Sequence, residues 1–110
     1  LAPKLALEDG RLDWSRPLAE IYARHRGVTP EPGAHTTVDG VLLKIIEAAP
    51  AEHEDPLEPG EIVARKAELL FGTATAPLAV RRVQPSGRAA MNAVDWWRGR
   101  RVDGTPRAGA

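Results

Sequence analysis

The segment Ala34–Ala48, which reads AHTTVDGVLLKIIEA, gives the clearest structural signal in the chain. Its Asp39-Gly40 pair lies between two strand-like runs and predicts a hairpin, because a tight two-residue turn needs residues that tolerate positive φ. From Val41 to Ile46, apolar side chains alternate onto both faces and Lys44 is the one charged residue. A strand that is apolar on both faces belongs in the interior of a sheet. We therefore expect the second strand of this hairpin, Val41–Ala48, to be central in a β structure.

Downstream of the hairpin, the pattern continues with short strands. The acidic stretch Ala49–Pro59, which contains three prolines, is expected to be a solvated loop. Short apolar runs then recur about every ten residues, which is typical of a barrel or a sandwich. These runs are Glu61–Ala64, Leu69–Thr73 and Leu78–Gln84. Asn92 is expected to cap a final short helix that contains Trp96 and Trp97 and ends near Gly99.

Upstream of the hairpin, the spacing predicts one helix. Ser15 is the expected N-cap, Pro17 lies in the first turn, and Gly27 is the expected stop. Apolar residues at spacings of three and four form one face of this helix: Leu18, Ile21, Tyr22 and His25. We also expect Trp14 to be buried where the helix meets the barrel. The whole pattern predicts a mainly β barrel of five or six strands, with one short helix before and one after them.

Length and composition limit the class of protein. A chain of 110 residues predicts one domain, and 43% hydrophobic residues can build a core. The absence of cysteine excludes disulfides, thiolate metal ligands and a cysteine nucleophile, and fits a cytoplasmic location. No apolar run approaches the ~20 residues of a membrane span, and no signal-peptide pattern opens the chain. Because the chain begins with Leu1 rather than Met, we expect it to be part of a longer protein.

The net charge is zero, but the charges are unevenly distributed. Residues 47–61 contain six acids and no lysine or arginine. Residues 81–110 contain seven arginines against Asp95 and Asp103. A local excess of five positive charges could face a polyanion, although the same arginines could simply solvate the surface.

Catalytic and metal-binding patterns are missing from the sequence. His25 lies on the apolar face of the predicted helix, His35 lies in a strand beside threonines, and His53 lies in the acidic loop. Their spacing does not match a set of metal ligands. The run Gly72–Thr75 lacks the lysine and the following helix of a phosphate-binding loop. We therefore expect no catalytic residue and no metal ligand in this chain.

Several blocks, in order, resemble the C-terminal domain of bacterial methionyl-tRNA formyltransferases over nearly the whole chain. They are Ala2-Pro3-Lys4-Leu5, Glu8–Pro17 (EDGRLDWSRP), Arg26–Ala34 (RGVTPEPGA), Pro59-Gly60-Glu61-Ile62 and Val83–Met91 (VQPSGRAAM), followed by Ala93-x-Asp95 and Arg98-Gly99. Each block alone is a common turn or cap, and their order and spacing carry the resemblance. The chain departs from the family in Val28–Pro32 and in Ala74-Thr75-Ala76-Pro77, and we expect the second departure to affect only a hairpin tip.

The resemblance implies a fold and a role. The family's C-terminal domain is an open Greek-key barrel related to the oligonucleotide-binding type, and here it would span residues 1–102. Residues 1–12 would form a leading or linker segment, and residues 103–110 a disordered or frayed tail. The parent enzyme transfers a formyl group from 10-formyltetrahydrofolate to methionine on initiator tRNA, a one-carbon reaction that serves translation initiation. Its folate site and catalytic groups belong to an N-terminal domain outside this chain, so this fragment would hold initiator methionyl-tRNA, bind no cofactor and be inactive alone.

The resemblance also implies candidate tRNA contacts. Lys4 matches a lysine of the family's leading segment, and Arg100 and Arg101 match the basic pair after its last helix. Charge alone adds weaker candidates: Arg24, Arg26, Lys44, Arg82 and Arg88. Two other readings stay open. The chain could be the C-terminal module of another enzyme that uses 10-formyltetrahydrofolate, or a protein-interaction module without RNA binding that presents its Trp96 and Trp97 face to a partner.

Overall fold

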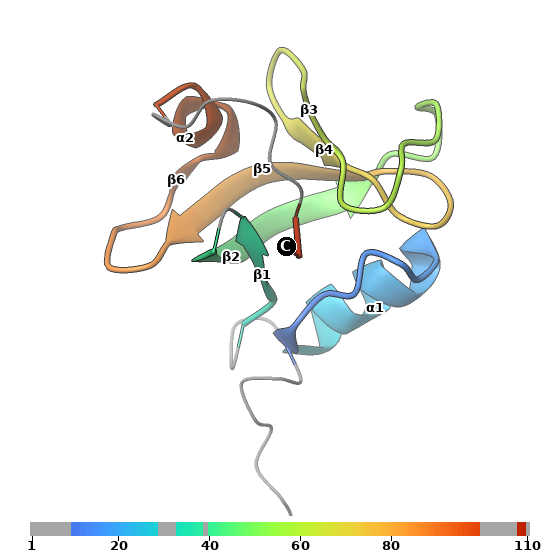
Figure 1. Ribbon diagram of the computed structural model, residues 1–110, viewed down its shortest axis with the longest axis horizontal. Coiled ribbons are helices and arrows are strands. Elements are labelled where there is room, and N and C mark those ends of the chain that lie inside the picture. The colour runs from blue at the N-terminus through green and yellow to red at the C-terminus, as the bar shows by residue number, and fades with distance from the viewer. Residues whose placement is uncertain (1–9, 29–32, 39, 100–107, 110) are drawn as a thin grey trace, which may run out of the picture.

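The computed structural model describes residues 10–28, 33–38, 40–99 and 108–109. Two helices flank six strands, as the sequence predicts. In chain order the elements are α1 (Leu18–Val28), β1 (His35–Val38), β2 (Val41–Pro50), β3 (Ile62–Ala64), β4 (Leu69–Phe71), β5 (Leu78–Pro85), β6 (Met91–Asn92) and α2 (Ala93–Gly99). Figure 1 shows one curled sheet with α1 beside it and α2 at the far end. The predicted mainly β architecture is confirmed.

The strand order is that of an open Greek key. The sheet runs β1-β2-β5-β4-β3, all neighbours are antiparallel, and β6 adds to β5. Three successive strands, β3 to β5, followed in space by β2, form the Greek-key arrangement. β1 and β3 end this path, and the described residues show no pairing between them. The register of β2 on β5 shifts on both sides of Glu47. Such irregularities bend a strand and help the sheet to curl.

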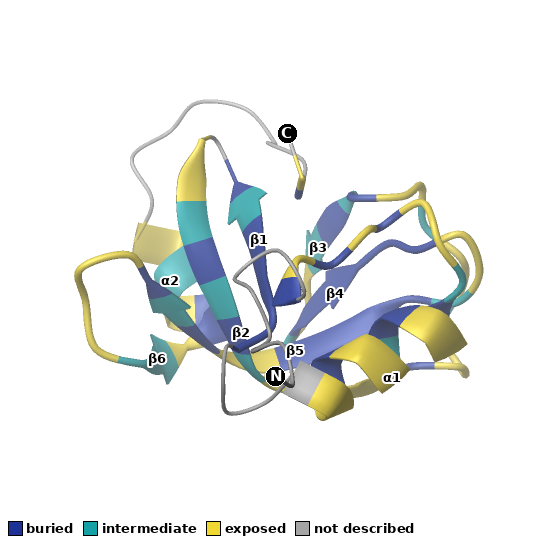
Figure 2. Cartoon of the chain, turned by 90° about the horizontal axis from the view of Figure 1, so that it is seen from below, coloured by how far each residue is buried: buried dark blue, intermediate teal, exposed yellow. Residues whose placement is uncertain are grey.

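The concave side of the sheet holds the core. Figure 2 shows that buried residues make up most of β1, β4 and β5, whereas exposed residues are frequent in α1 and in the loops. The largest fully buried side chains include Leu12, Leu43, Ile45, Leu69, Phe71, Leu78, Val80 and Val83. β2 lies between β1 and β5, which confirms that the strand with two apolar faces is interior. Its exposed end is Val41, the only large hydrophobic residue with high exposure among those described, at 49%.

Trp14 is buried as expected. Only 4% of its surface is exposed, and its ring stacks on Phe71 with the centroids 5.0 Å apart. The indole Nε1–H donates to Thr36 Oγ1 at 2.9 Å, which satisfies the one polar atom of the side chain. Just before it, Leu12 N–H donates to the carbonyl of His35, and Arg11 forms a parallel bridge to the same residue. This part of the predicted leading segment is therefore built into the barrel.

The predicted N-cap at Ser15 is wrong. Ser15 gives its backbone N–H (3.0 Å) and its hydroxyl (2.6 Å) to the Asp13 carboxylate, and α1 begins only at Leu18. The N–H of Leu18 donates instead to the hydroxyl of Thr75, at 3.0 Å. Thr75 belongs to the stretch Ala74–Pro77 between β4 and β5, which we expected to affect only a hairpin tip. The tertiary fold brings this turn to the start of α1, where its hydroxyl replaces a local cap.

At the C-terminal end, the cap was predicted correctly. Asn92 Oδ1 accepts from the N–H groups of Val94 (2.9 Å) and Asp95 (3.2 Å), which are the bonds expected of an N-cap side chain. The expectation of a frayed tail over residues 103–110 is wrong for Ala108 and Gly109. Both lie against the barrel, and Ala108 is only 7% exposed, because their backbone N–H groups find partners on the sheet. The other residues of that tail lie outside the described part of the chain.

Candidate nucleic-acid interface

Four polar residues form one row across the strands. A parallel bridge pairs Arg11 with His35, the β1–β2 register pairs His35 with Lys44, and the β2–β5 register pairs Lys44 with Gln84. Directly paired residues point to the same face of a sheet. The neighbours of Lys44 within β2 are fully buried on the core side, so the row lies on the opposite, outer face. We call Arg11, His35, Lys44 and Gln84 the polar row.

The polar row presents two cations with a buried histidine between them. His35 is 6% exposed, and its Nδ1 lies 3.3 Å from the carbonyl oxygen of Gly33. Arg11 is exposed and Lys44 is half-buried. Among the described residues, neither cation has an acidic ion-pair partner within 4.0 Å. The row can therefore offer two positive charges to an anion at the surface.

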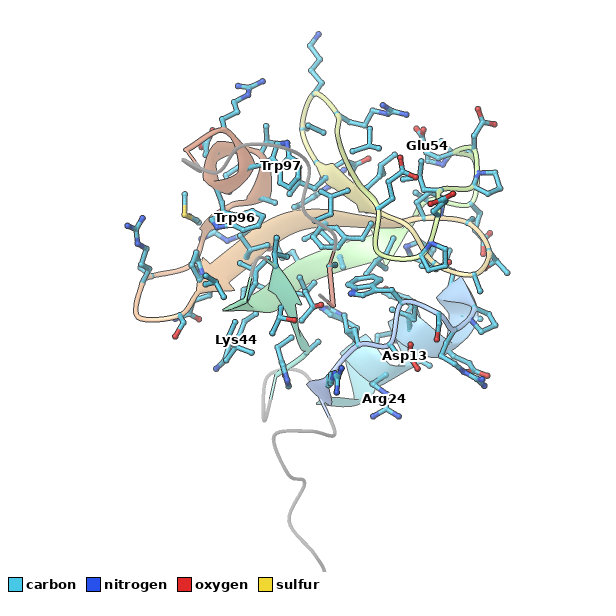
Figure 3. All side chains as sticks on the ribbon, viewed as in Figure 1. Asp13, Arg24, Lys44, Glu54, Trp96 and Trp97 are labelled. Carbon is cyan, nitrogen blue, oxygen red and sulfur yellow. The ribbon has the colours of Figure 1, made fainter. Side chains whose placement is uncertain are left out.

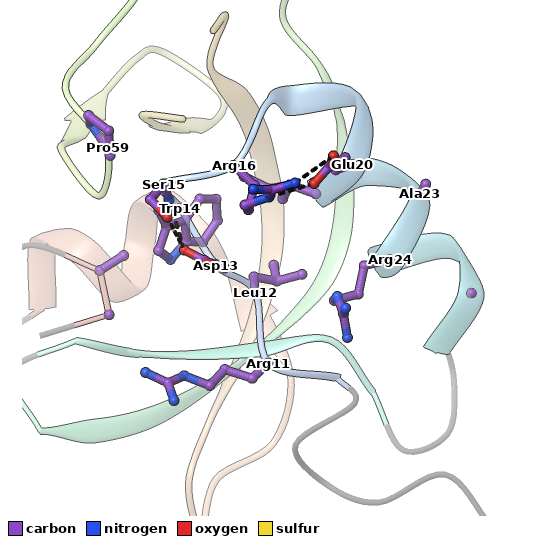
Figure 4. A pocket seen from close by; sticks show the side chains of 14 residues that line it. Arg11, Leu12, Asp13, Trp14, Ser15, Arg16, Glu20, Ala23, Arg24 and Pro59 are labelled. Atoms are coloured by element: carbon purple, nitrogen blue, oxygen red, sulfur yellow. Dashed lines mark hydrogen bonds and ion pairs between the residues drawn. The ribbon is translucent and has the colours of Figure 1, made fainter. Parts of the chain in front are cut away.

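A groove continues from the row towards α1. It is lined by the segment Arg11–Arg16, by α1 and by the C-terminal residues Ala108 and Gly109, and its volume is about 1270 Å³. Figure 4 shows Arg24 on α1 and Arg11 on the segment that leads into the barrel, and both line the groove. In Figure 3, Lys44 and Arg24 lie on one side of the barrel and Glu54 lies at the opposite corner. Positive side chains from three separate parts of the chain thus gather on one side.

The acids within the groove already have partners. Arg16 and Glu20 form an exposed ion pair at 2.7 Å, with two hydrogen bonds, which lowers the pKa of Glu20 and raises that of Arg16. The Ser15 hydroxyl and backbone N–H both donate to Asp13, and these bonds lower the pKa of its carboxyl. All three groups are charged at neutral pH. Arg11 and Arg24 are the other two cations that line the groove.

The candidate tRNA contacts that the structure describes lie in different parts of the molecule. Lys4, Arg100 and Arg101 lie outside the described residues. Arg24 lies in the groove and Lys44 in the polar row. Arg26 is exposed on α1 with its guanidinium 5.7 Å from the centre of the Tyr22 ring. The fold thus brings Lys44 and Arg24 to one side and adds Arg11, which the charge analysis missed.

Arg82 and Arg88 lie elsewhere. Arg82 is exposed on β5, where the strand register places it opposite the acidic residue Glu47. Arg88 lies in the turn after β5, where its N–H donates to Pro85 O and its own carbonyl accepts from the side chain of Gln84, both at 3.0 Å. The backbone of Arg88 therefore stabilises the turn. Beside this turn, Leu42, Lys44 and residues 84–87 line a smaller hollow of about 210 Å³.

Two other arginines form exposed ion pairs with acidic residues. Arg65 lies 3.4 Å from Glu54, and Arg81 lies 3.4 Å from Glu68. Exposed pairs of this kind add little stability, but they reduce the local positive potential. These pairs offset the charges of Arg65 and Arg81, whereas Arg11 and Lys44 have no acidic partner within 4.0 Å among the described residues.

None of the three histidines joins a catalytic arrangement in the described residues. His53 is exposed in the acidic loop, 3.5 Å from Glu54. No cluster of three metal-ligating side chains occurs among the residues that the structure describes. His25 is buried, and its Nε2 lies 3.0 Å from the carbonyl oxygen of Ile45, so this nitrogen carries the proton and donates. His25 thus links α1 to β2, which fits the core position that the sequence predicts.

Burial of His25 makes stability depend on pH. Desolvation lowers the pKa of His25 below the ordinary value of about 6.5, and the hydrogen bond to Ile45 only partly opposes this. The unfolded chain therefore binds a proton more readily than the folded chain. We expect the free energy of unfolding to fall as the pH drops from about 7 to about 5, by at most about 1.4 kcal/mol per pH unit for one proton. Urea titrations at each pH should show a smaller fall in His25→Gln, which keeps a donor but does not titrate. Equal falls in both proteins would contradict this role.

The two tryptophans of α2 are both half-buried. Their ring centroids are 6.0 Å apart, and both pack against the core cluster. The structure therefore distributes burial between the two side chains. Neither described helix is long and apolar enough to cross a membrane.

Comparison with known proteins identifies the family that this chain matches. Residues 4–101 match the family described as "Formyl transferase, C-terminal domain". A methionyl-tRNA formyltransferase of Clavibacter sepedonicus is 54% identical over 99 residues, which cover 90% of this chain and 32% of that protein. A methionyl-tRNA formyltransferase of Streptomyces coelicolor is 39% identical over 109 residues, 99% of this chain and 35% of that protein. The chain spans about a third of the length of these relatives.

Solved structures share the fold at lower identity. The structure of HypX from Aquifex aeolicus in complex with tetrahydrofolic acid superposes with a TM-score of 0.75 and 22% identity, covering 86% of this chain and 17% of HypX. This likeness supports the open barrel with its two flanking helices. The family match covers nearly the whole chain, and it agrees with the order of sequence blocks that carries the resemblance. The chain therefore belongs to the formyl transferase C-terminal domain family.

Proposed function

We propose that this chain is the tRNA-binding C-terminal domain of a methionyl-tRNA formyltransferase in the cytoplasm. The parent enzyme would transfer a formyl group from 10-formyltetrahydrofolate to methionine on initiator tRNA, for translation initiation. Its catalytic groups and folate site would lie in an N-terminal domain of the same protein. The polar row with its adjoining groove carries the proposal, because these elements gather Arg11, Lys44 and Arg24 on one side.

The chemistry of this side suits an RNA backbone. Arginine and lysine contact phosphates and so fix the position of a nucleic acid without reading its sequence. Proteins recognise RNA helices largely through shape and backbone contacts. The aromatic side chains described here are buried or half-buried, which does not fit a platform that stacks unpaired bases. The fold alone does not select a substrate, so the support comes from these cations together with the names of the relatives.

The test is the salt dependence of tRNA affinity. With about three phosphate contacts, raising salt from about 50 to about 200 mM should weaken binding about 20- to 40-fold. Changing Arg11, Arg24 and Lys44 together to glutamine should flatten the slope of log affinity against log salt by about two units. The loss should be similar for initiator and elongator tRNA, because phosphate contacts carry no base identity. Filter binding or fluorescence anisotropy with the full chain would measure both.

A control variant removes the same charge from the other half of the barrel. Arg65→Gln, Lys66→Gln and Arg81→Gln combined should leave the salt slope within about half a unit of the parent value. Changing Arg100 and Arg101 to alanine tests the pair proposed from the family: if this pair supplies the contacts in place of the polar row and groove, it should flatten the slope by about one to two units. If the variant of Arg11, Arg24 and Lys44 and the variant of Arg65, Lys66 and Arg81 change the salt slope equally, the cations of the polar row and groove do not form the interface.

The proposal assigns no bond-making step to this chain. We expect no formyl transfer when the purified chain is incubated with methionyl-tRNA and 10-formyltetrahydrofolate. Acid-gel separation of formylated and unformylated methionyl-tRNA would detect turnover, with a full-length relative as the positive control. Formylated product above the no-protein background, and proportional to the amount of this chain, would contradict the expectation.

A further inference from the structure

The two C-terminal residues that the structure describes connect β1 to the turn that precedes β3. Ala108 N–H donates to Gly60 O at 2.8 Å, and Gly109 N–H donates to Thr37 O at 2.6 Å. Ala108 also forms an antiparallel bridge with Val38 of β1. Gly60 directly precedes the residues that lead into β3. Figure 2 shows the C-terminal end of the chain between β1 and β3.

These contacts rest on a packed surface. Ala108 is 7% exposed and belongs to the main core cluster. A Cβ built on Gly109 would lie 3.4 Å from Cδ1 of Trp14, so the indole lies directly beside this backbone. Trp14 is held in turn by Phe71 and by the hydroxyl of Thr36. The C-terminal residues therefore seal one side of the barrel core.

Two glycines, Gly60 and Gly109, adopt positive φ angles at this contact. Gly60 has φ +82, and a Cβ built there would lie only 2.7 Å from the carbonyl oxygen of Ala108. Gly109 has φ +84. Both conformations are unfavourable for residues with a side chain. At Gly60 the missing side chain also provides the space for the backbone of Ala108.

We propose that Thr37, Val38, Gly60 and Trp14 form an acceptor site for an extended peptide segment, and that its occupant is the chain's own C-terminus, docked intramolecularly. The site uses the edge of β1 at Thr37 and Val38, beyond the bridge of Arg11 to His35, as proteins do when they add a peptide strand to a sheet. Its occupant lies outside residues 4–101, which match the family. The site shares no residue with the cations tested above, and its readouts need no RNA, so the two proposals fail separately.

The first experiment measures coupling between the two sides of the contact. Gly60→Ala adds both φ strain and a clash with Ala108, whereas Gly87→Ala adds the strain alone, since Gly87 has φ +76 and no atom within 4 Å of the added Cβ. Gly60→Ala should lower Tm by roughly 4–8 °C more than Gly87→Ala. Gly109→Pro cannot adopt φ +84 or donate to Thr37, and it releases the C-terminus without changing the charge.

In the Gly109→Pro background, the extra loss caused by Gly60→Ala should disappear, because the oxygen of Ala108 no longer occupies the space. Losses of Tm that simply add, or equal losses for Gly60→Ala and Gly87→Ala in the parent chain, would overturn the proposal. This comparison remains informative even if every variant loses some stability. All four proteins keep the C-terminal residues and the net charge.

The second experiment observes the docked residue directly. In the full chain, the backbone amide of Ala108 should exchange its hydrogen at least about tenfold more slowly than in Gly109→Pro, as measured by NMR. Exchange of the Ala108 amide at the rate of an unstructured peptide in the parent chain would contradict docking. The protection should not change on dilution of the sample. Protection that is lost on dilution would show that the C-terminus of a second copy fills the site, which overturns the intramolecular assignment.

Discussion

Replacing Phe71 with alanine is expected to lower the free energy of unfolding by about 3–5 kcal/mol. Phe71 is fully buried, pairs with Ile62 and Leu78 on the neighbouring strands, and stacks on Trp14. Truncation removes apolar contacts and leaves a cavity that β4 cannot fill, because both of its neighbours are held in register. Urea unfolding followed by tryptophan fluorescence would measure the loss.

A loss of this size is a large fraction of the roughly 5–15 kcal/mol that stabilises a typical domain, so Phe71→Leu serves as a milder second variant. It should retain most of the packing and lose less than half as much. Val41→Ala is the matched control, because Val41 is 49% exposed and its truncation should cost within about 0.5 kcal/mol. If Phe71→Ala cost no more than Val41→Ala, the packing of Trp14 on β4 would be incorrect.

Gly72→Ala is expected to cost about 2–3 kcal/mol by a different mechanism. A methyl group at Gly72 would overlap the carbonyl oxygen of Glu58 and lie 2.9 Å from Cβ of Leu57. The backbone there cannot move away, because Gly72 N–H donates to Glu61 O (2.7 Å) and Gly60 N–H donates to Gly72 O (2.9 Å). The variant must therefore break this backbone pairing or displace the loop before β3.

The control for Gly72→Ala is Gly27→Ala. Gly27 lies in α1 with no atom within 4 Å of an added Cβ, so alanine should be neutral or stabilise the chain by up to about 1 kcal/mol. Thermal unfolding of both variants beside the parent chain would show opposite signs of the shift in Tm. A Gly72→Ala protein as stable as the parent would show that the loop before β3 does not contact the end of β4.

Part of the candidate site could be predicted from the sequence. Charge counting selected Arg24 and Lys44, which the fold places on one side of the barrel. It also selected Arg82, which the β2–β5 register places opposite Glu47. Arg11 was missed because it precedes the first predicted element. Its position depends on a bridge to His35, 24 residues away in the sequence, and no local pattern reports such a pairing.

The sequence by itself determined the local elements of this protein. The Asp39-Gly40 pair, the alternation after Val41 and the Asn92 cap each depend on neighbouring residues, because turn geometry, side-chain period and capping bonds are local properties. Tertiary structure alone decided that the Thr75 hydroxyl meets the start of α1, that Arg11 and Lys44 share one row, and that Ala108 and Gly109 join β1 to Gly60. These contacts depend on the curl and register of the whole sheet, which only the packed core fixes.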